Sequence, residues 1–267
     1  MNAKRLYPTI EDRFASLLCL RCDVTSGFND VARRLVGPDS LPHILGIKHD
    51  EIGLVAFRKP IFPAAVIDCK AAIRFLRGNA ETYELDRTHF AVVEGSAGAN
   101  LAEMVAVTDE AAELSDLTLG YAEESCAIQA CVAWFGPTDF LRMDEQLAET
   151  GLGPGDHNDA ASPESRYMGG QITELDPEWV QKANPMTHIH PGIPPIYLQH
   201  GERDHVVPMM QSAIFAQEIE RRLGPGCVRF EILEGADHAD PAFATRENMR
   251  KVYAFLNERL GSDGKTD

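Results

Sequence analysis

The stretch VVEGSAGANLAEM, residues 92–104, joins a short apolar run to an alanine-rich segment with a high helix propensity. Ser96 stands at the junction between the two. A strand that turns sharply into a helix lifts a serine hydroxyl clear of the sheet, and small neighbours let strand and helix approach each other. The usual pattern for such a turn is Gly-x-Ser-x-Gly, and Glu94 occupies its first glycine position. The rest of the chain must therefore decide between a nucleophile and an ordinary serine in a small-residue loop.

Strand-like apolar runs alternate with helix-like periodicity on both sides of this stretch. Such alternation predicts a mostly parallel sheet with helices on both faces. Ligands bind such sheets beyond the carboxyl ends of the strands, so chemistry is expected in the loops that follow them. The predicted strands are residues 51–58, 89–94, 126–135, 194–201 and 227–235, and the predicted helices are residues 62–79, 97–108, 209–223 and 247–260.

The segment from Asp139 to His190 differs from the rest of the chain in being polar and rich in glycine and proline. A connection of this length inside a single domain is usually functional or disordered. We expect one domain over residues 1–267, with residues 139–190 as a lid-like insertion over the active-site edge. The alternative is a plain surface connection.

A serine hydroxyl becomes a good nucleophile only when a base takes its proton and a carboxylate orients that base. Asp204, in HGERDHVVP, follows one predicted strand, and His238, in EGADHADPAF, follows the next. Their order after Ser96 and their places at strand ends predict a triad of Ser96, Asp204 and His238. Asp139, in WFGPTDF after an earlier strand, is the rival acid.

The charge balance disfavours nucleic acid and anionic membranes as partners, because 41 acidic residues against 25 lysines and arginines give a net charge of −16. A small-molecule substrate is expected, and the oligomeric state stays open. Cys19 and Cys22 are spaced as a redox or metal pair, but no second pair follows. The start of the chain has no small-residue cleavage site. Reduced thiols and a cytoplasmic protein are therefore expected.

Six stretches between about Leu54 and Leu260 carry a resemblance to a known family: FPAAVIDCKAAIRFLR, GSAGANLA, WFGPTDF, SPESR, ANPMTHIHPGIPPIYLQHGERDHVVP and EGADHADPAF. Over this range the chain resembles α/β-hydrolase esterases, and it is closest to the bifunctional feruloyl and acetyl-xylan esterase group. The resemblance implies an α/β-hydrolase fold and a serine hydrolase that cleaves carboxylic esters through an acyl-enzyme. It places Ser96, Asp204 and His238 at the triad positions and implies no metal and no cofactor.

The resemblance fails before Leu54, where such esterases carry a His-Gly-Gly loop. That loop supplies a backbone N–H which completes the oxyanion hole with the N–H after the nucleophile, here that of Ala97. The segment SLLCLRCDVTSGFNDVARRLVG instead places Cys22 and Asp23 where the glycines belong. We therefore expect an oxyanion hole built from Ala97 and the region of Cys22 and Asp23, and amino-terminal strands that are truncated or remodelled.

Three functions remain to be compared. The first is a carboxylesterase acting on small acyl or feruloyl-type esters. The second is a catalytically weak or inactive α/β-hydrolase-fold protein, which the missing His-Gly-Gly loop favours and the triad opposes. The third is a peptidase, for which no sequence feature marks a peptide site.

Overall fold

One parallel sheet organises the chain, and the computed structural model describes residues 17–18, 61–83 and 85–260 of it. The described strands lie in sequence order, and every neighbouring pair is parallel. The register brings Gly95 opposite Trp134, and Trp134 opposite Gln199, so the carboxyl ends of the central strands lie at one edge. The strands are β1 (Leu17–Leu18), β2 (Ala91–Gly95), β3 (Ala130–Trp134), β4 (Ile196–Gly201) and β5 (Val228–Leu233).

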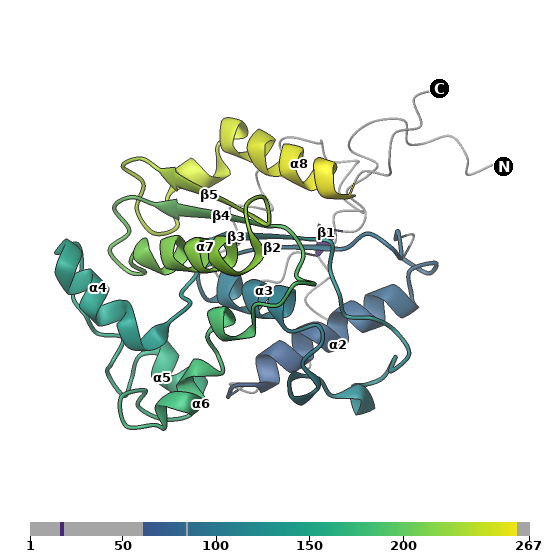
Figure 1. Cartoon of the computed structure of the whole chain (residues 1–267), viewed down its shortest axis with the longest axis horizontal. Coiled ribbons are helices and arrows are strands. Elements are labelled where there is room, and N and C mark those ends of the chain that lie inside the picture. The colour runs from purple at the N-terminus through teal and green to yellow at the C-terminus, as the bar shows by residue number, and fades with distance from the viewer. Residues whose placement is uncertain (1–16, 19–60, 84, 261–267) are drawn as a thin grey trace.

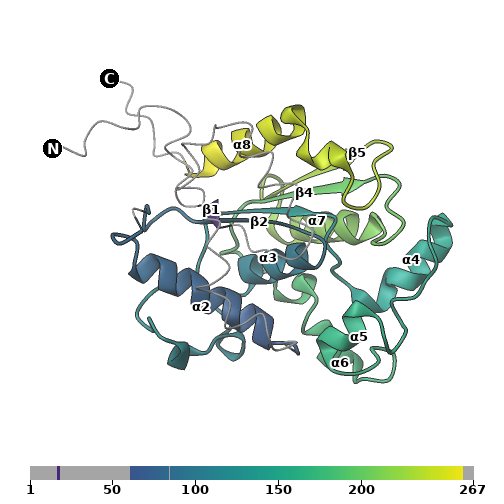
Figure 2. The same cartoon turned by 180° about the vertical axis from the view of Figure 1, so that it is seen from behind.

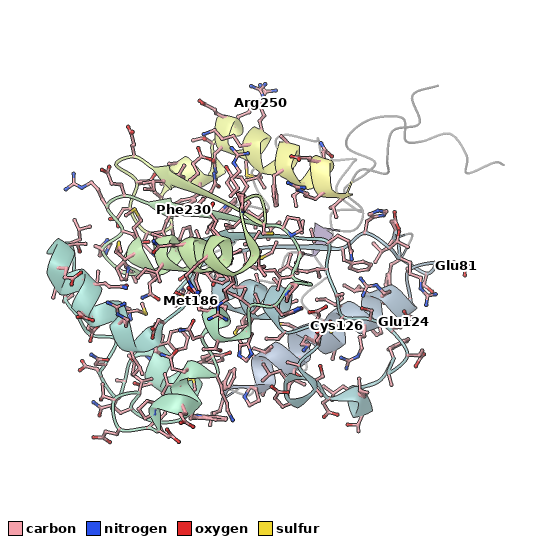
Figure 3. The ribbon with its side chains drawn as sticks, viewed as in Figure 1. Glu81, Glu124, Cys126, Met186, Phe230 and Arg250 are labelled. Carbon is pink, nitrogen blue, oxygen red and sulfur yellow. The ribbon has the colours of Figure 1, made fainter. Side chains whose placement is uncertain are left out.

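Helices cover both faces of the sheet (Figures 1 and 2). Because side chains alternate across a strand, Val92 packs towards α2 (Ala64–Gly78), α3 (Ala97–Val107) and α7 (Met210–Leu223), and its neighbour Val93 packs towards α8 (Arg246–Leu260). Arg250 is exposed on the outer side of α8 (Figure 3). Within residues 61–83 and 85–260, no helix has both the length and the apolar character of a membrane span.

Most predicted elements appear within a few residues of their expected bounds. The predicted strand 51–58 lies outside the described residues. The strand predicted from Cys126 begins only at Ala130, so its first residues were assigned wrongly. In the segment before Ala130, the carbonyl oxygens of Ser125 and Ala127 accept hydrogen bonds from the Arg77 guanidinium and so have a side-chain donor in place of a strand partner. Figure 3 shows Cys126 beside α2, the helix that carries Arg77.

Residues 139–190 fold into short helices that share an apolar cluster with α2 and α3. The core side chains include Phe140, Met143 and Met168, which cluster with Val66 of α2 and Met104 of α3. The segment is therefore packed against the sheet-covering helices and is not a loose connection; that it covers a substrate pocket stays a prediction. Its elements are η5 (Phe140–Arg142), α4 (Met143–Thr150), α5 (Pro163–Met168), α6 (Pro177–Gln181) and η6 (Pro185–His188), and the remaining 3₁₀ turns of the described chain are η3 (Ala112–Leu114), η4 (Leu117–Leu119) and η7 (Pro241–Ala244).

A buried charge pair fixes this segment to the loop after β4. His157 is 5% exposed; its Nδ1 lies 3.1 Å from Glu164 Oε2, and its Nε2 lies 2.8 Å from the Val206 carbonyl oxygen. Burial alone would lower the pKa of His157, but the Glu164 carboxylate, the Val206 carbonyl and Asp144 outweigh it and raise the pKa to about 9. His157 is therefore a cation at neutral pH.

This pair predicts a pH-dependent contribution to stability. The pKa of His157 is raised from 6.5 to about 9, so the folded chain holds a proton that the unfolded chain releases between those values. The contribution is complete below about pH 6.5 and is lost as the pH rises through about 9. We expect the difference in free energy of unfolding between wild type and His157→Gln, measured with urea, to shrink across that range. A difference that stays constant with pH would show that His157 is neutral in the folded chain.

Candidate active site

The three side chains predicted as a triad meet at the carboxyl edge of the sheet. Ser96 follows β2, Asp204 follows β4 and His238 follows β5. His238 Nε2 lies 3.0 Å from Ser96 Oγ, and His238 Nδ1 lies 2.8 Å from Asp204 Oδ2. With Nδ1 donating to the carboxylate, Nε2 is left free to accept the serine proton. The arrangement can therefore activate a hydroxyl nucleophile.

The backbone at Ser96 is held in a conformation that few non-glycine residues adopt. Its φ is 57° and its ψ is −130°, between the end of β2 and the start of α3. Such geometry costs on the order of 1–3 kcal/mol and persists only where the surroundings enforce it. Here the Ser96 N–H donates to the Trp134 carbonyl at 2.9 Å, and the Ser96 carbonyl accepts from the Ala99 N–H at 2.9 Å. The turn thus presents the hydroxyl above the sheet edge.

The structure accommodates Glu94 at the first glycine position of the Gly-x-Ser-x-Gly turn, which is called the nucleophile elbow. The side chain is 1% exposed and lies over Gly98, where an added Cβ would come within 2.8 Å of Glu94 Oε2. The second glycine of the motif is therefore what leaves room for the glutamate.

Gly95 serves a similar purpose for an aromatic ring. An added Cβ there would meet the Phe135 ring at 2.8 Å. Phe135 in turn packs edge-on against the His238 ring, with 4.7 Å between the centroids. The absence of a side chain at Gly95 thus leaves the space in which Phe135 packs against the imidazole of His238.

Asp204 is buried and accepts hydrogen bonds on both carboxylate oxygens. Oδ1 accepts from the Val206 and Val207 N–H groups at 2.9 and 2.8 Å, and Oδ2 accepts from His238. Burial on its own would raise the pKa of Asp204, but hydrogen bonding to His200 and His238 holds the pKa below its usual range. The carboxylate is therefore ionised and oriented at neutral pH.

The rival acid, Asp139, lies in a separate network. Its Oδ1 accepts from Gln181 Nε2 at 2.9 Å, and its backbone N–H donates to Gln211 Oε1 at 2.7 Å. Of the two candidate acids, it is Asp204 that hydrogen-bonds to His238.

Ala97 is the first residue of α3 and is exposed beside Ser96. Its N–H belongs to the first turn, whose N–H groups have no acceptor within the helix and carry partial positive charge. Cys22 and Asp23, the other predicted oxyanion residues, lie outside the described residues, as does the Cys19–Cys22 pair. In the part of the chain that is described, no group of three or more His, Cys, Asp or Glu side chains is placed to hold a metal ion.

Two histidines near the acid, His200 and His157, were not predicted from the sequence. His200 is fully buried, and its Nε2 lies 3.3 Å from Asp204 Oδ2. It precedes Asp204 by four residues in HGERD, so its place in the same strand-end motif was a usable signal. His157 has no such signal, because it comes from the polar insertion.

Several known proteins are similar to this chain. The family model described as BD-FAE matches residues 55–219. The esterase LipQ of Mycobacterium tuberculosis is 31% identical to the chain over 200 residues, which are 75% of this chain and 44% of LipQ. The chain thus spans less than half the length of this relative.

Two solved structures resemble the fold. A truncated form of a carbohydrate esterase from gut microbiota has 26% identity and a TM-score of 0.63, with 76% of this chain and 70% of that chain covered. A thermophilic esterase from the Planctomycetes species Thermogutta terrifontis has 25% identity and a TM-score of 0.52, with 76% of this chain and 66% of that chain covered. With the parallel sheet and its helices, they confirm the predicted α/β-hydrolase fold. Taken with the match over residues 55–219, this shows that the chain belongs to the BD-FAE family of α/β-hydrolase-fold proteins.

Proposed function

We propose that this chain is a serine carboxylic-ester hydrolase that acts through an acyl-enzyme. The observation that carries the proposal is the continuous path of contacts from Ser96 Oγ through His238 to Asp204. The names of the relatives support the reaction class, since LipQ and both solved structures are called esterases.

In the first half of the proposed reaction, Ser96 Oγ attacks the ester carbonyl carbon while His238 Nε2 takes the hydroxyl proton. Asp204 stabilises the imidazolium that forms. The carbonyl oxygen becomes an oxyanion, and in this proposal it accepts a hydrogen bond from the N–H of Ala97, the residue after the nucleophile. The tetrahedral intermediate then collapses, and His238 returns the proton to the departing alcohol oxygen. Ser96 is left esterified with the acyl group.

In the second half, water replaces the alcohol. His238 takes one water proton while the water oxygen attacks the acyl carbon. Collapse of this second intermediate breaks the bond to Ser96 Oγ, which takes the proton back from His238, and releases the carboxylic acid. Neither half requires a metal or an organic cofactor.

The proposed substrates are small-molecule esters with small acyl or feruloyl-type acyl groups. Membership of the BD-FAE family and the likeness to a carbohydrate esterase support this class. The insertion over residues 139–190 is proposed to shape the choice of acyl group. The alternative is a catalytically weak α/β-hydrolase-fold protein, and the two contacts that join Ser96, His238 and Asp204 argue against it.

Removing the nucleophile is the most direct test of the reaction. Ser96→Ala is expected to lower the kcat for an activated aryl acetate by about a millionfold, because the acyl-enzyme cannot form. Ser125→Ala is the matched control, since Ser125 is exposed and lies away from the sheet edge. Retention of wild-type turnover by the Ser96 variant would remove Ser96 from the mechanism.

Paired substitutions separate the two acids. Asp204→Asn is expected to lower kcat by about 10⁴-fold, because the amide can donate to His238 Nδ1 and so favours the wrong imidazole tautomer. Asp139→Asn removes the same charge from a residue that hydrogen-bonds Gln181 and Gln211, so kcat should change far less. Steady-state hydrolysis of one aryl acetate by both variants gives the comparison, and a larger loss in the Asp139 variant would reverse the assignment.

A further inference from the structure

We propose that His157 and His200 clamp residues 204–207, the acid turn, and act as positioning residues for Asp204. The inference rests on the proposed function, and it gives the insertion a part in holding the reacting groups. The clamp joins three regions of the chain: α5 and its preceding loop, β4, and α7.

His200 contacts the acid turn from β4. Its Nε2 lies 2.9 Å from the Val207 carbonyl oxygen and 3.3 Å from Asp204 Oδ2, and its Nδ1 lies 2.7 Å from Ser212 Oγ. A carbonyl oxygen can only accept, so Nε2 carries a proton. In the neutral ring Nδ1 then accepts the proton of the Ser212 hydroxyl. His200, Ser212 and the Asp204 side chain are all fully buried, so no water competes for these bonds.

His157 holds the same turn from the side of the insertion. Its Nε2 lies 2.8 Å from the Val206 carbonyl oxygen, and Glu164 and Asp144 hold the rest of the residue. Glu164 lies against the ring at Nδ1, and Asp144 Oδ1 accepts the backbone N–H of His157 at 2.9 Å. His157 is thus anchored at two points in addition to its contact with the acid turn.

The two histidines act on the residues that orient the carboxylate. The N–H groups of Val206 and Val207 donate to Asp204 Oδ1, and the carbonyl oxygens of the same two residues accept from His157 and His200. The N–H groups and the carbonyl oxygens of Val206 and Val207 are therefore all hydrogen-bonded, and Asp204 Oδ2 is held towards His238. Displacing a catalytic group by about 1 Å can cost on the order of a hundredfold in rate, which is why such anchoring matters.

Leucine and glutamine variants of each histidine test the clamp. Leucine has no donor, whereas a glutamine amide places a donor near the position of Nε2. For His157→Leu and His200→Leu we expect kcat for an aryl acetate to fall by about 10- to 100-fold with KM nearly unchanged, and the glutamine variants to recover most of the loss. His188→Leu is the matched control, because His188 Nε2 donates to the Lys182 carbonyl at 2.8 Å within the same insertion. Its kcat should match that of the wild type.

A second readout does not depend on ester hydrolysis. The His238 Nδ1–H proton, bound to Asp204, is expected to give a downfield proton resonance that persists in the wild type and the glutamine variants. In the leucine variants it should broaden as its exchange with water accelerates. If the wild type does not hydrolyse esters, broadening of this resonance in the leucine variants would still support the clamp, while the proposed function would fail.

Ser212→Ala covers the case in which a leucine variant does not fold. It leaves His200 in place and removes only the hydroxyl that donates to His200 Nδ1. We expect a several-fold fall in kcat and a broader His238 resonance, with KM nearly unchanged. The clamp is overturned if folded variants, with thermal transitions close to that of the wild type, keep wild-type kcat and an unchanged resonance while the wild type itself hydrolyses esters.

Discussion

The buried carboxylate of Asp204 is the constraint on which the site depends. An ionised group taken out of water is stable only when hydrogen-bond donors surround it. Two donors come from the turn that Asp204 itself begins, and others come from His238 after β5 and His200 at the end of β4. The sheet brings these donors together because β4 and β5 are neighbours whose carboxyl ends lie at the same edge. Once Asp204 is fixed, the direction of His238 towards Ser96 follows.

The elbow shows how a departure from the usual pattern can be accommodated without changing the fold. Glu94 fills the space above Gly98, and Gly95 leaves space for Phe135, which packs against His238. The preference for glycine at position 94 is thus broken where the surrounding packing holds the backbone in place. Departures of this kind are common at functional sites. The strained φ of Ser96 is kept by hydrogen bonds to β3 and to the first turn of α3.

The sequence predicts those parts of the fold and site that depend on local patterns. Apolar spacing identified α2, and chain order with strand-end placement identified Asp204 and His238, because parallel strands gather their following loops at one edge. Contacts between distant segments leave no such pattern. The hydrogen bonds from Arg77 to carbonyl oxygens about 50 residues away, in the segment before β3, are one example. The contact of His157 with Val206, which lies 49 residues further along the chain, is another. The sequence of a polar insertion does not indicate whether the insertion touches the acid turn.

The crystal structure of the chain after reaction with an ester-like phosphonate tests the central claim most directly. The account predicts a covalent bond from phosphorus to Ser96 Oγ, with His238 Nε2 beside the adduct and a phosphonyl oxygen accepting from the Ala97 N–H. It also predicts that Asp204 keeps its contacts with Val206 and Val207. Phosphorus on a different residue, or an unreacted Ser96 in a protein that still hydrolyses the matching ester, would contradict it.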